Sequence, residues 1–457
     1  MRSFAKRKVD IDADLREEVP EQPSAQVLDA LQQKAHRLIP GGCHTYAKGD
    51  DQYPAVAPAF LARGAGCHVW DTAGNEFIEY GMGLRAVTLG HAYQPVVEAA
   101  TKQMLLGNNY TRPAPIEVEC AEALLSLIKG ADMVKFAKDG STVVTAAVKL
   151  ARAFTGREFV AICGDHPFFS YNDWFIGTTP IDAGIPEVNK SLTLAFRYND
   201  LQSLRALFDK HPGQIACVLM EAARTEEPRA RFLQEVQALC RAHGALFILD
   251  ETITGFRWHN NGAQHAYDVV PDLSIFGKAL ANGFSLSALV GKHEVMELGG
   301  IRHDKPRVFL LSTTHGAENH SLAAAIATIS VYRHEPVIEH LYRQGERLRN
   351  GIEAAAAQLG VGRHLIVSGR ACNLLYATLD QEMRPSQAFR TLFLQEIIKR
   401  GVIAPSLAVS YSHTDADIDR TVEAIEGALR IYKQALEEGV ERYLVGASVK
   451  PVYRRYN

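Results

Sequence analysis

The chain has 457 residues, with 49 Lys and Arg, 52 Asp and Glu, and a formal net charge of −3. A hydrophobic share of 47% and a charged share of 22% exclude wholesale disorder and a fibrous repeat. The near-neutral balance provides no basic field, which argues against nucleic acid or an anionic membrane as the main partner.

The cysteine spacing and the N-terminal sequence indicate in which cellular compartment the protein works. The seven cysteines are scattered without a C-x-x-C pair, which suits neither a disulfide framework nor a zinc knuckle and favours a reducing environment. Residues 1–25 hold no apolar core of a secretory signal, and no apolar run approaches the roughly 20 residues that span a bilayer. We therefore expect a cytoplasmic protein that does not use a membrane.

Residues 1–75 are predicted to form an N-terminal arm, a helix and a hairpin region. The arm over residues 1–25 is charged and contains Pro, and a helix follows over residues 25–38 until the IPGG turn at 39–42. Residues 60–80 contain two apolar segments around the DTAGN turn at 71–75, which is the pattern of a β-hairpin.

Residues 76–335 are predicted to form a large domain. Short apolar runs alternate there with helical patterns, and the runs fall at 134–136, 159–163, 215–221, 245–250 and 273–276. Buried strands that alternate with helices predict an α/β fold with a mostly parallel sheet. Ligands in such folds lie at the carboxyl ends of the strands.

Residues 336–457 are predicted to form a smaller α+β C-terminal domain. Pro336 marks a break after a helix over about 319–331, and the pattern then becomes helical over 338–359. A mixed part around 367–379 and a final helix over 415–437 complete this domain.

The turn DGST at 139–142 precedes a helix with apolar residues at helical spacing. Free N–H groups and the positive end of a helix make a phosphate cradle, to which Ser141 and Thr142 add hydroxyl donors beside Gly140. The alternative is a plain N-cap. The turn matches neither G-x-G-x-x-G nor G-x-x-x-x-G-K-[ST], which weakens NAD and P-loop interpretations.

The segment FILDETITGFR at 247–257 delivers two adjacent carboxylates, Asp250 and Glu251, to the end of an apolar strand. Side chains alternate along a strand, so one carboxylate can face a ligand while the other braces the scaffold. The alternative is a helix cap.

The segment DLSIFGKALANG at 272–283 ends another apolar strand in Gly277 and Lys278. A Lys just past a buried strand points to an amine that is paired or covalently used. The alternative is a solvated surface Lys.

No metal is expected. The acidic run at 415–419 resembles a calcium loop, but it lacks the Gly at the sixth position and the terminal Glu. Thr414 as the N-cap of a helix with acids in its first turn explains this run better.

These motifs occur in one order: the phosphate turn, Glu221 at a strand end, DETITGFR, GKALANG, and STTHGAE at 312–318. The combination resembles the class III pyridoxal-phosphate (PLP) aminotransferases, and within them the glutamate-1-semialdehyde 2,1-aminomutase branch. The resemblance runs from IPGG through VWDTAGNEFIEY and LGHAYQPV to HTDADIDRTVEAI. It implies fold type I, with a mostly parallel seven-stranded sheet in the large domain and a smaller C-terminal domain.

The resemblance also implies roles for single residues. Lys278 matches the Schiff-base lysine, which serves as general acid and base once substrate displaces it. Asp250 matches the carboxylate that pairs with the pyridine nitrogen and keeps the ring an electron sink. Glu221 matches a glutamate near the phenolic side of the cofactor.

Further cofactor contacts follow from the same resemblance. The phosphate turn supplies Gly140, Ser141 and Thr142, and Ile253 belongs to the segment after the paired carboxylate. Thr314 matches a threonine that reaches a phosphate across the dimer interface. The expected active unit is therefore a homodimer with shared sites.

Three departures from the family pattern stand out. The usual aromatic ring position falls on Asp165, so we expect His166 to stack on the cofactor, with Phe168 and Phe169 as packing. Thr252 stands where the family usually has the Val of an Asp-Glu-Val triplet. After IPGG, the aminomutase segment of Ser-Pro-Val-Arg type is replaced by CHTYAK at 43–48. The substrate side should thus differ, with candidate residues Arg85, His44, Tyr46 and Lys48, for which structural ion pairs or solvated charges are the alternative.

The hypothesis is a PLP-dependent aminotransferase that moves an amino group from a donor such as glutamate to a small aldehyde or ketone, hydroxylated or anionic and sugar-like, in biosynthesis. The first alternative is an aminomutase that shifts an amino group within one substrate, since it needs the same residues. The second is a non-catalytic PLP-fold binding protein, against which the presence of both Lys278 and Asp250 argues.

Overall fold

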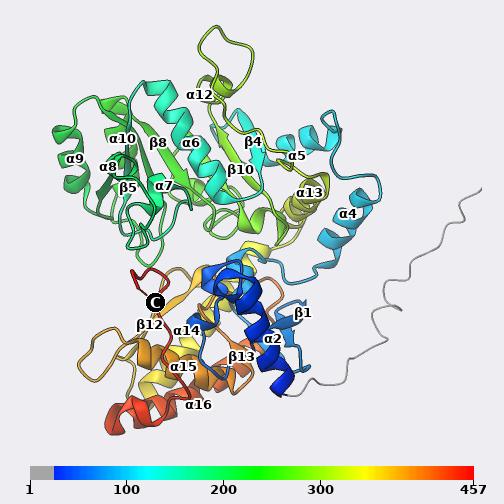
Figure 1. Ribbon diagram of the computed structural model, residues 1–457, viewed down its shortest axis with the longest axis vertical. Coiled ribbons are helices and arrows are strands. Elements are labelled where there is room, and N and C mark those ends of the chain that lie inside the picture. Colours follow the sequence, from blue (N-terminus) through cyan, green and yellow to red (C-terminus); the bar gives the residue numbers. More distant parts are fainter. Residues whose placement is uncertain (1–24, 457) are drawn as a thin grey trace, which may run out of the picture.

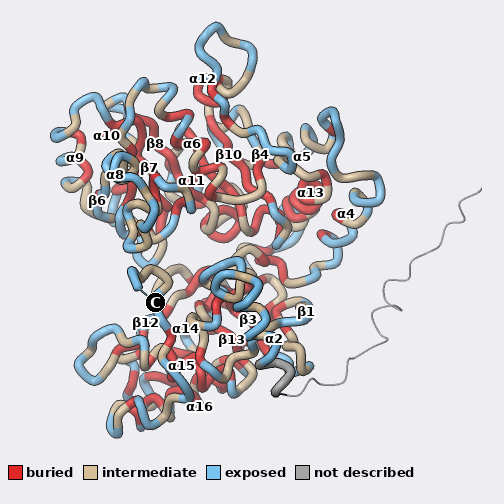
Figure 2. The backbone as a smooth tube through the Cα atoms, viewed as in Figure 1, coloured by how far each residue is buried: buried red, intermediate tan, exposed pale blue. Residues whose placement is uncertain are grey.

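The computed structural model describes residues 25–456, which form two lobes (Figure 1). The N-terminal arm expected over residues 1–25 lies, except for Ala25, outside the described residues. One lobe holds the middle of the chain and the large sheet; the other combines the N-terminal helix with the C-terminal third. Buried residues concentrate inside each lobe (Figure 2). Among residues 25–456, no helix combines the length and apolar character needed to cross a membrane.

The large sheet has seven strands in the order β4-β10-β9-β8-β7-β5-β6. The five strands from β9 to β6 are parallel, and β10 runs antiparallel to both of its neighbours. Every residue of β7 and β8 is buried, as continuous apolar runs in a parallel sheet predict. The strands are β4 (Met133–Ala137), β5 (Phe159–Cys163), β6 (Thr193–Phe196), β7 (Ile215–Glu221), β8 (Leu246–Asp250), β9 (Leu273–Phe276) and β10 (Ser287–Gly291).

Helices cover both faces of this sheet. Cys217 and Leu219 of β7 belong to one hydrophobic cluster with α6, whereas Val218 and Met220 pack in another with α10 and α13. This arrangement confirms the expected α/β fold. The longer helices of this lobe are α4 (Gln94–Met104), α5 (Pro115–Leu125), α6 (Gly140–Thr155), α9 (Leu201–Lys210), α10 (Phe232–His243) and α13 (Asn319–His334). The short ones are α7 (Asp173–Ile176), α8 (Glu187–Ser191), α11 (Ala263–Ala266), α12 (His293–Met296), η4 (Lys278–Ala281) and η5 (Glu297–Gly299).

The second lobe contains a four-stranded sheet, β1-β2-β3-β13, built from both ends of the chain. The predicted hairpin is present as β2 and β3, and β1 extends it to a meander. The expected boundary between residues 75 and 76 does not separate this sheet from the C-terminal part: β3 begins at Glu76 and pairs in parallel with β13. The reason is that the outer edge of β3 needs hydrogen-bond partners, which β13 supplies. The strands are β1 (Leu61–Ala65), β2 (His68–Asp71), β3 (Glu76–Glu79) and β13 (Val402–Ile403).

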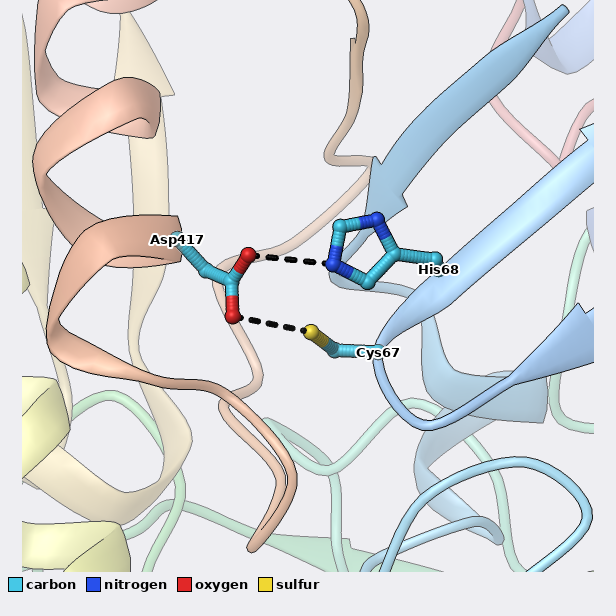
Figure 3. Close-up of side chains that lie close together, drawn as sticks. All are labelled: Cys67, His68 and Asp417. Atoms are coloured by element: carbon cyan, nitrogen blue, oxygen red, sulfur yellow. Dashed lines mark hydrogen bonds and ion pairs between the residues drawn. The ribbon is translucent and has the colours of Figure 1, made fainter.

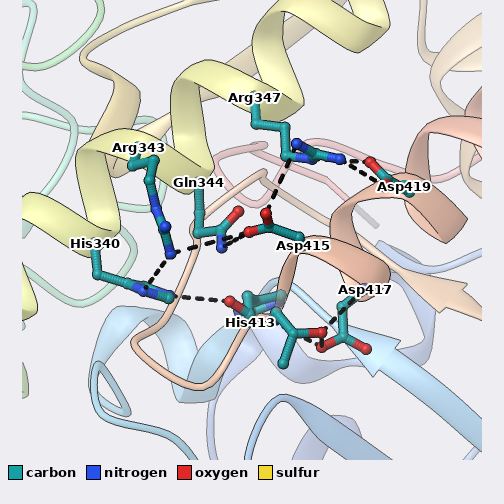
Figure 4. Close-up of polar contacts among 9 residues, drawn as sticks. His340, Arg343, Gln344, Arg347, His413, Asp415, Asp417 and Asp419 are labelled. Carbon is teal, nitrogen blue, oxygen red and sulfur yellow. Dashed lines mark hydrogen bonds and ion pairs between the residues drawn. The ribbon is translucent and has the colours of Figure 1, made fainter.

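Three long helices form the rest of this lobe with a two-stranded sheet. The expected break at Pro336 falls between α13 and α14, and Thr414 caps α16 through a capping box with Asp417, as predicted. Polar contacts join α14 to the start of α16, among them Arg347 to Asp419 at 2.7 Å (Figure 4). The remaining elements are α2 (Ala25–Leu38), η1 (Pro40–Gly42), η2 (Tyr46–Lys48), η3 (Asp50–Gln52), α3 (Met82–Arg85), α14 (Val337–Leu359), β11 (Leu365–Ser368), η6 (Ala371–Asn373), β12 (Leu375–Thr378), α15 (Gln387–Ile398), α16 (Asp415–Glu438) and η7 (Val440–Arg442).

Candidate active site

A cavity of about 520 Å³ opens at the carboxyl ends of the central strands. Glu221 ends β7, Asp250 ends β8 and Lys278 follows β9, and all three line the cavity. A parallel α/β sheet places ligands at this edge. The other lining residues are Thr45, Ala86, Lys138, Asp139, Gly140, Ser141, Phe168, Phe169, Tyr171, Thr252, Ile253 and residues 283–287.

The two carboxylates that follow one another at the end of β8 have different surroundings. Asp250 lines the cavity, and its Oδ1 accepts the N–H of Thr252 at 2.9 Å. Glu251 points into the scaffold, where its carboxylate accepts the N–H groups of Ala263 and Gln264 at 2.8 and 2.6 Å and the hydroxyl of Thr254. The alternation along a strand predicts this division of roles.

Burial raises the pKa of Asp250 to about 6, and the carboxylate of Glu221 adds to this effect, whereas Thr252 and Lys278 oppose it. The residues Glu221 and Asp250 lie side by side because β7 and β8 pair in that register. Asp250 is thus an acid that a cation placed in the cavity would hold in its ionised form.

Glu221 is buried, and its Oε2 has no hydrogen-bond partner within residues 25–456. Its Oε1 lies 3.9 Å from Nη1 of Arg224. Burial raises the pKa of Glu221, while the charges of Arg224 and Lys278 lower it. A buried carboxylate oxygen that faces a cavity without a partner indicates that a ligand group completes this site.

The position of Lys278 depends on the close approach of the chain after β9 to strand β10. A Cβ atom on Gly277 would lie 2.7 Å from Oγ of Ser287, so any larger residue there would force the Ser287 side chain to move. Lys278 itself adopts a positive φ of 45° at the start of η4. Burial lowers the pKa of Lys278, and Asp250 and Glu221 oppose this shift. A lower pKa increases the share of neutral amine, which is the nucleophilic form.

The predicted phosphate turn forms the N-terminus of α6 at the cavity wall. Gly140 and Ser141 line the cavity, and Oγ of Ser141 accepts the N–H of Tyr171 at 3.2 Å while keeping its own proton to donate. Thr142 is outside the lining: its N–H and hydroxyl both donate to the N-cap carboxylate of Asp139. Two of the three expected phosphate contacts therefore face the cavity.

The expected stacking residue, His166, is outside the cavity lining. Its Nδ1 accepts the backbone N–H of Glu221 at 3.1 Å, and its ring packs beside Tyr198 with centroids 5.2 Å apart. Burial lowers its pKa to about 3, so the ring is neutral. The aromatic rings in the cavity wall belong instead to Phe168, Phe169, Tyr171 and Phe284.

The segment over residues 43–48, which we expected on the substrate side, lines the cavity through a residue that was not among the candidates. Thr45 lines the cavity, but His44, Tyr46 and Lys48 are absent from its lining. Tyr46 is 69% exposed, and Lys48 lines a second cavity of about 540 Å³ between α2 and the four-stranded sheet. The 3-10 turn over 46–48 directs these side chains away.

Arg85 lies behind the cavity wall, which its neighbour Ala86 forms. Its Nε donates to Oδ1 of Asn373 at 2.8 Å. Burial lowers the pKa of Arg85 to about 10, and the nearby cation of Arg257 adds to this.

The two remaining predicted residues lie in different places. Ile253 lines the cavity. Thr314 is exposed on the loop before α13, where its carbonyl accepts from Nδ2 of Asn109 at 2.9 Å. Within this one chain, Thr314 contributes nothing to the cavity lining.

Several cavity residues were not predicted. Lys138 directly precedes the phosphate turn, so its position was a usable signal, and its Nζ pairs with Glu318. Tyr171 and Phe284 also line the cavity, but no local pattern marks them. Ser287 belongs to β10, whose antiparallel insertion between β4 and β9 brings it beside Gly277.

Comparison with known proteins gives consistent results. The family model "Aminotransferase class-III" matches residues 50–429. A glutamate-1-semialdehyde 2,1-aminomutase of Desulforudis audaxviator is 31% identical over 422 residues, which cover 87% of this chain and 96% of the relative.

Solved structures are also similar. The PLP internal aldimine form of the Sphingopyxis sp. MTA144 FumI protein has a TM-score of 0.83 and 29% identity, covering 90% of this chain and 97% of that one. An omega-transaminase from Sphaerobacter thermophilus has a TM-score of 0.79 and 26% identity, covering 91% and 98%.

The cavity fits PLP on its own chemistry. The cavity is lined by the amine of Lys278, the buried carboxylate of Asp250 and the oxygen of Glu221 that has no partner among the described residues. The N-terminus of the long helix α6 can bind a phosphate group there. With this donor set and the match over most of its length, the chain belongs to the class III aminotransferases, enzymes of fold type I that use PLP.

Proposed function

We propose that this protein is a transaminase that takes an amino group from an amino donor such as glutamate and transfers it to an aldehyde or ketone. The observation that carries the proposal is the placement of the Lys278 amine, Asp250 and Glu221 around one buried cavity. A protein that only bound the cofactor would need neither a lysine of lowered pKa nor the buried carboxylate beside it.

In this proposal, Lys278 has two tasks. Its neutral amine holds the cofactor covalently until substrate displaces it, and it then moves a proton at the substrate carbon that carries the amino group. The bound cofactor supplies the electron sink for this chemistry. Burial of Lys278 supports both tasks, because it favours the neutral base.

The proposed tasks of the other residues are electrostatic. Asp250 would hold a proton on the ring nitrogen of the cofactor, and Glu221 would lie near its phenolic side. Gly140 and Ser141 bind the phosphate through backbone N–H groups and a hydroxyl. Phe168 and Phe169 pack against the ring in place of His166, which instead holds the backbone of Glu221.

We propose a hydroxylated or anionic, sugar-like acceptor from a biosynthetic pathway. Thr45, Lys138 and Tyr171 give the cavity wall a hydroxyl, an ammonium and a phenol, which supports this class. An aminomutase is the second candidate, because aminomutases are about 30% identical over most of the chain. The two differ in one measurable respect: a mutase turns over without an external amino donor.

We further propose a homodimer in the cytoplasm. Thr314 sits on an exposed loop next to Asn109, and Met104, Leu105 and Leu106 close by expose large apolar side chains. A second copy that covers this surface would bring Thr314 toward the partner's cavity. The seven cysteines are all free, which is consistent with a reducing compartment.

The test uses the full-length protein loaded with PLP. Candidate amines are added alone, and the cofactor absorbance reports conversion to its amino form; carbonyl acceptors are then offered to that form. Lys278→Ala should lose this conversion, and Lys278→Arg, which keeps the charge, should lose it too. A wild-type protein that turns over a substrate without any donor would support the mutase, and substantial turnover by Lys278→Ala would falsify the proposal.

A further inference from the structure

A second cluster of reactive side chains lies in the other lobe, away from the cavity that holds Lys278. Cys67 and His68 stand at the start of β2, and Asp417 stands in the first turn of α16 (Figure 3). One ligand atom of each residue lies within 4.8 Å of the other two. None of these three residues lines either described cavity, so the transaminase chemistry does not account for them.

The spacing of these atoms suits a tetrahedral ion. Bonds of roughly 2.0–2.3 Å at a tetrahedral angle put two ligand atoms roughly 3.3–3.5 Å apart. Nε2 of His68 lies 3.0 Å from Oδ1 of Asp417, and Sγ of Cys67 lies 3.4 Å from the other oxygen, Oδ2. The three ligand atoms all lie within 4.8 Å of one another, so side-chain rotations can bring them around one ion.

A carboxylate lies beside the second nitrogen of the imidazole. Nδ1 of His68 is 2.7 Å from Oε1 of Glu76 on the neighbouring strand β3, although the angle between them makes no hydrogen bond. A carboxylate that accepts the N–H of this nitrogen fixes the ring of a metal-bound histidine, and Glu76 is close enough to do so. This contact with Glu76 is independent of the three-residue cluster.

The donor set selects the ion. A thiolate, an imidazole and a carboxylate are the ligands of zinc, whereas calcium and magnesium take oxygen ligands only. The arrangement is not that of a catalytic cysteine, because the thiol of Cys67 contacts Asp417 and not the imidazole base.

We propose that Cys67, His68 and Asp417 bind one Zn²⁺ that fastens β2 to α16. Water is the fourth ligand, since the side chains of His68 and Asp417 are 25% and 14% exposed and leave an approach from solvent. Binding forms Zn–S, Zn–N and Zn–O bonds, releases waters from the ion and sends the thiol proton of Cys67 to solvent, with no change of oxidation state.

Without an ion, the thiol of Cys67 donates to Oδ2 of Asp417. The ion takes the place of that proton. Oδ2 also accepts the N–H and hydroxyl of Thr414 at 2.9 and 2.7 Å, which leaves Oδ1 for the ion.

The experiment measures zinc bound to the PLP-loaded, full-length protein. The protein is stripped with a chelator, titrated with ZnCl₂ at pH 7.5, and its metal content is determined by mass spectrometry after gel filtration. The wild type should retain one zinc per chain. Cys67→Ser, His68→Gln and Asp417→Asn should weaken binding by more than the roughly 10–100-fold expected for Glu76→Gln, which removes only the supporting carboxylate.

Cys43→Ser is the matched control, because Cys43 is a free, partly exposed thiol outside the cluster, and it should bind zinc like the wild type. The melting temperature gives a second readout: zinc at about 100 times its dissociation constant should raise Tm by roughly 3 °C in the wild type and in Cys43→Ser, but not in His68→Gln. His68 is partly exposed, so this variant should fold even if Cys67→Ser does not. Zinc retention well below one per chain in the wild type, or full retention in His68→Gln, would overturn the proposal.

Discussion

The floor of the active-site cavity and its substrate-side wall differ in how closely they follow the family pattern. The floor consists of strand-end residues Glu221 and Asp250 with Lys278, and the rigid central sheet fixes all three. The wall comes from loops, where Thr45 and Phe168 stand in segments that depart from the aminomutase sequence. This difference indicates that residues held by the sheet set the type of reaction, whereas residues on the loops set the choice of substrate.

The largest effect is expected at the centre of the floor. Lys278→Ala removes the amine that both holds the cofactor and moves the proton, so kcat/KM should fall by at least about 10³-fold. Steady-state assays with a saturating donor measure this. Lys292→Ala is the control, because Lys292 pairs with Asp272 outside the cavity, and it should retain activity.

Asp250→Asn should have the next largest effect. The neutral amide keeps the shape but loses the anion opposite the ring nitrogen, so kcat should fall by about 10²–10³-fold with little change in KM. Rates of the isolated half-reaction measure this. An unchanged kcat in this variant would show that catalysis does not depend on the negative charge of Asp250.

Glu251→Gln tests the scaffold side of the same strand end. It disturbs the hydrogen bonds to Ala263, Gln264 and Thr254, which should reduce the free energy of unfolding by about 1–3 kcal/mol while kcat/KM changes little. Denaturant unfolding provides the measurement. An activity loss as large as that of Asp250→Asn would remove the distinction between the two carboxylates.

The same residue predicts a pH dependence. Burial raises the pKa of Glu251 from its ordinary value of 4.5 to about 7. Protonated Glu251 therefore favours the folded state, so this stabilisation is complete below pH 4.5 and is lost as pH rises to about 7. In unfolding measurements, the wild type should therefore lose its stability advantage over Glu251→Gln as pH rises through that range. An advantage that grew with pH would contradict a raised pKa for Glu251.

The smallest effect is expected at the wall. Thr45→Ala should raise the KM of the acceptor by about 3–10-fold through loss of one hydrogen bond. Tyr46→Ala, one residue further and outside the lining, should leave KM unchanged. If Tyr46→Ala had the larger effect, the 43–48 segment would serve the cavity of a second copy.

The sequence predicted those features that depend on local patterns. The apolar runs revealed the central strands, and alternation separated Asp250 from Glu251. Helix signals located α2 and the Thr414 cap of α16.

Features that depend on long-range contacts could not be predicted. His166 lies behind Glu221 because the strand before it, β5, pairs in parallel with β7, and a two-residue strand such as β13 has no recognisable pattern. The sequence pattern places Asp417 in the acidic first turn of a helix, yet its side chain contacts Cys67, 350 positions earlier in the chain.

The pairing of β3 with β13 has a consequence for synthesis. Ile78 and Glu79 find their partners in Val402 and Ile403, which leave the ribosome more than three hundred residues later. Until then, the outer edge of β3 has open hydrogen-bonding groups of the kind that recruit strands from other chains. A nascent chain that stops before residue 402 should therefore be prone to aggregate and to need chaperones, even though its central sheet is already complete.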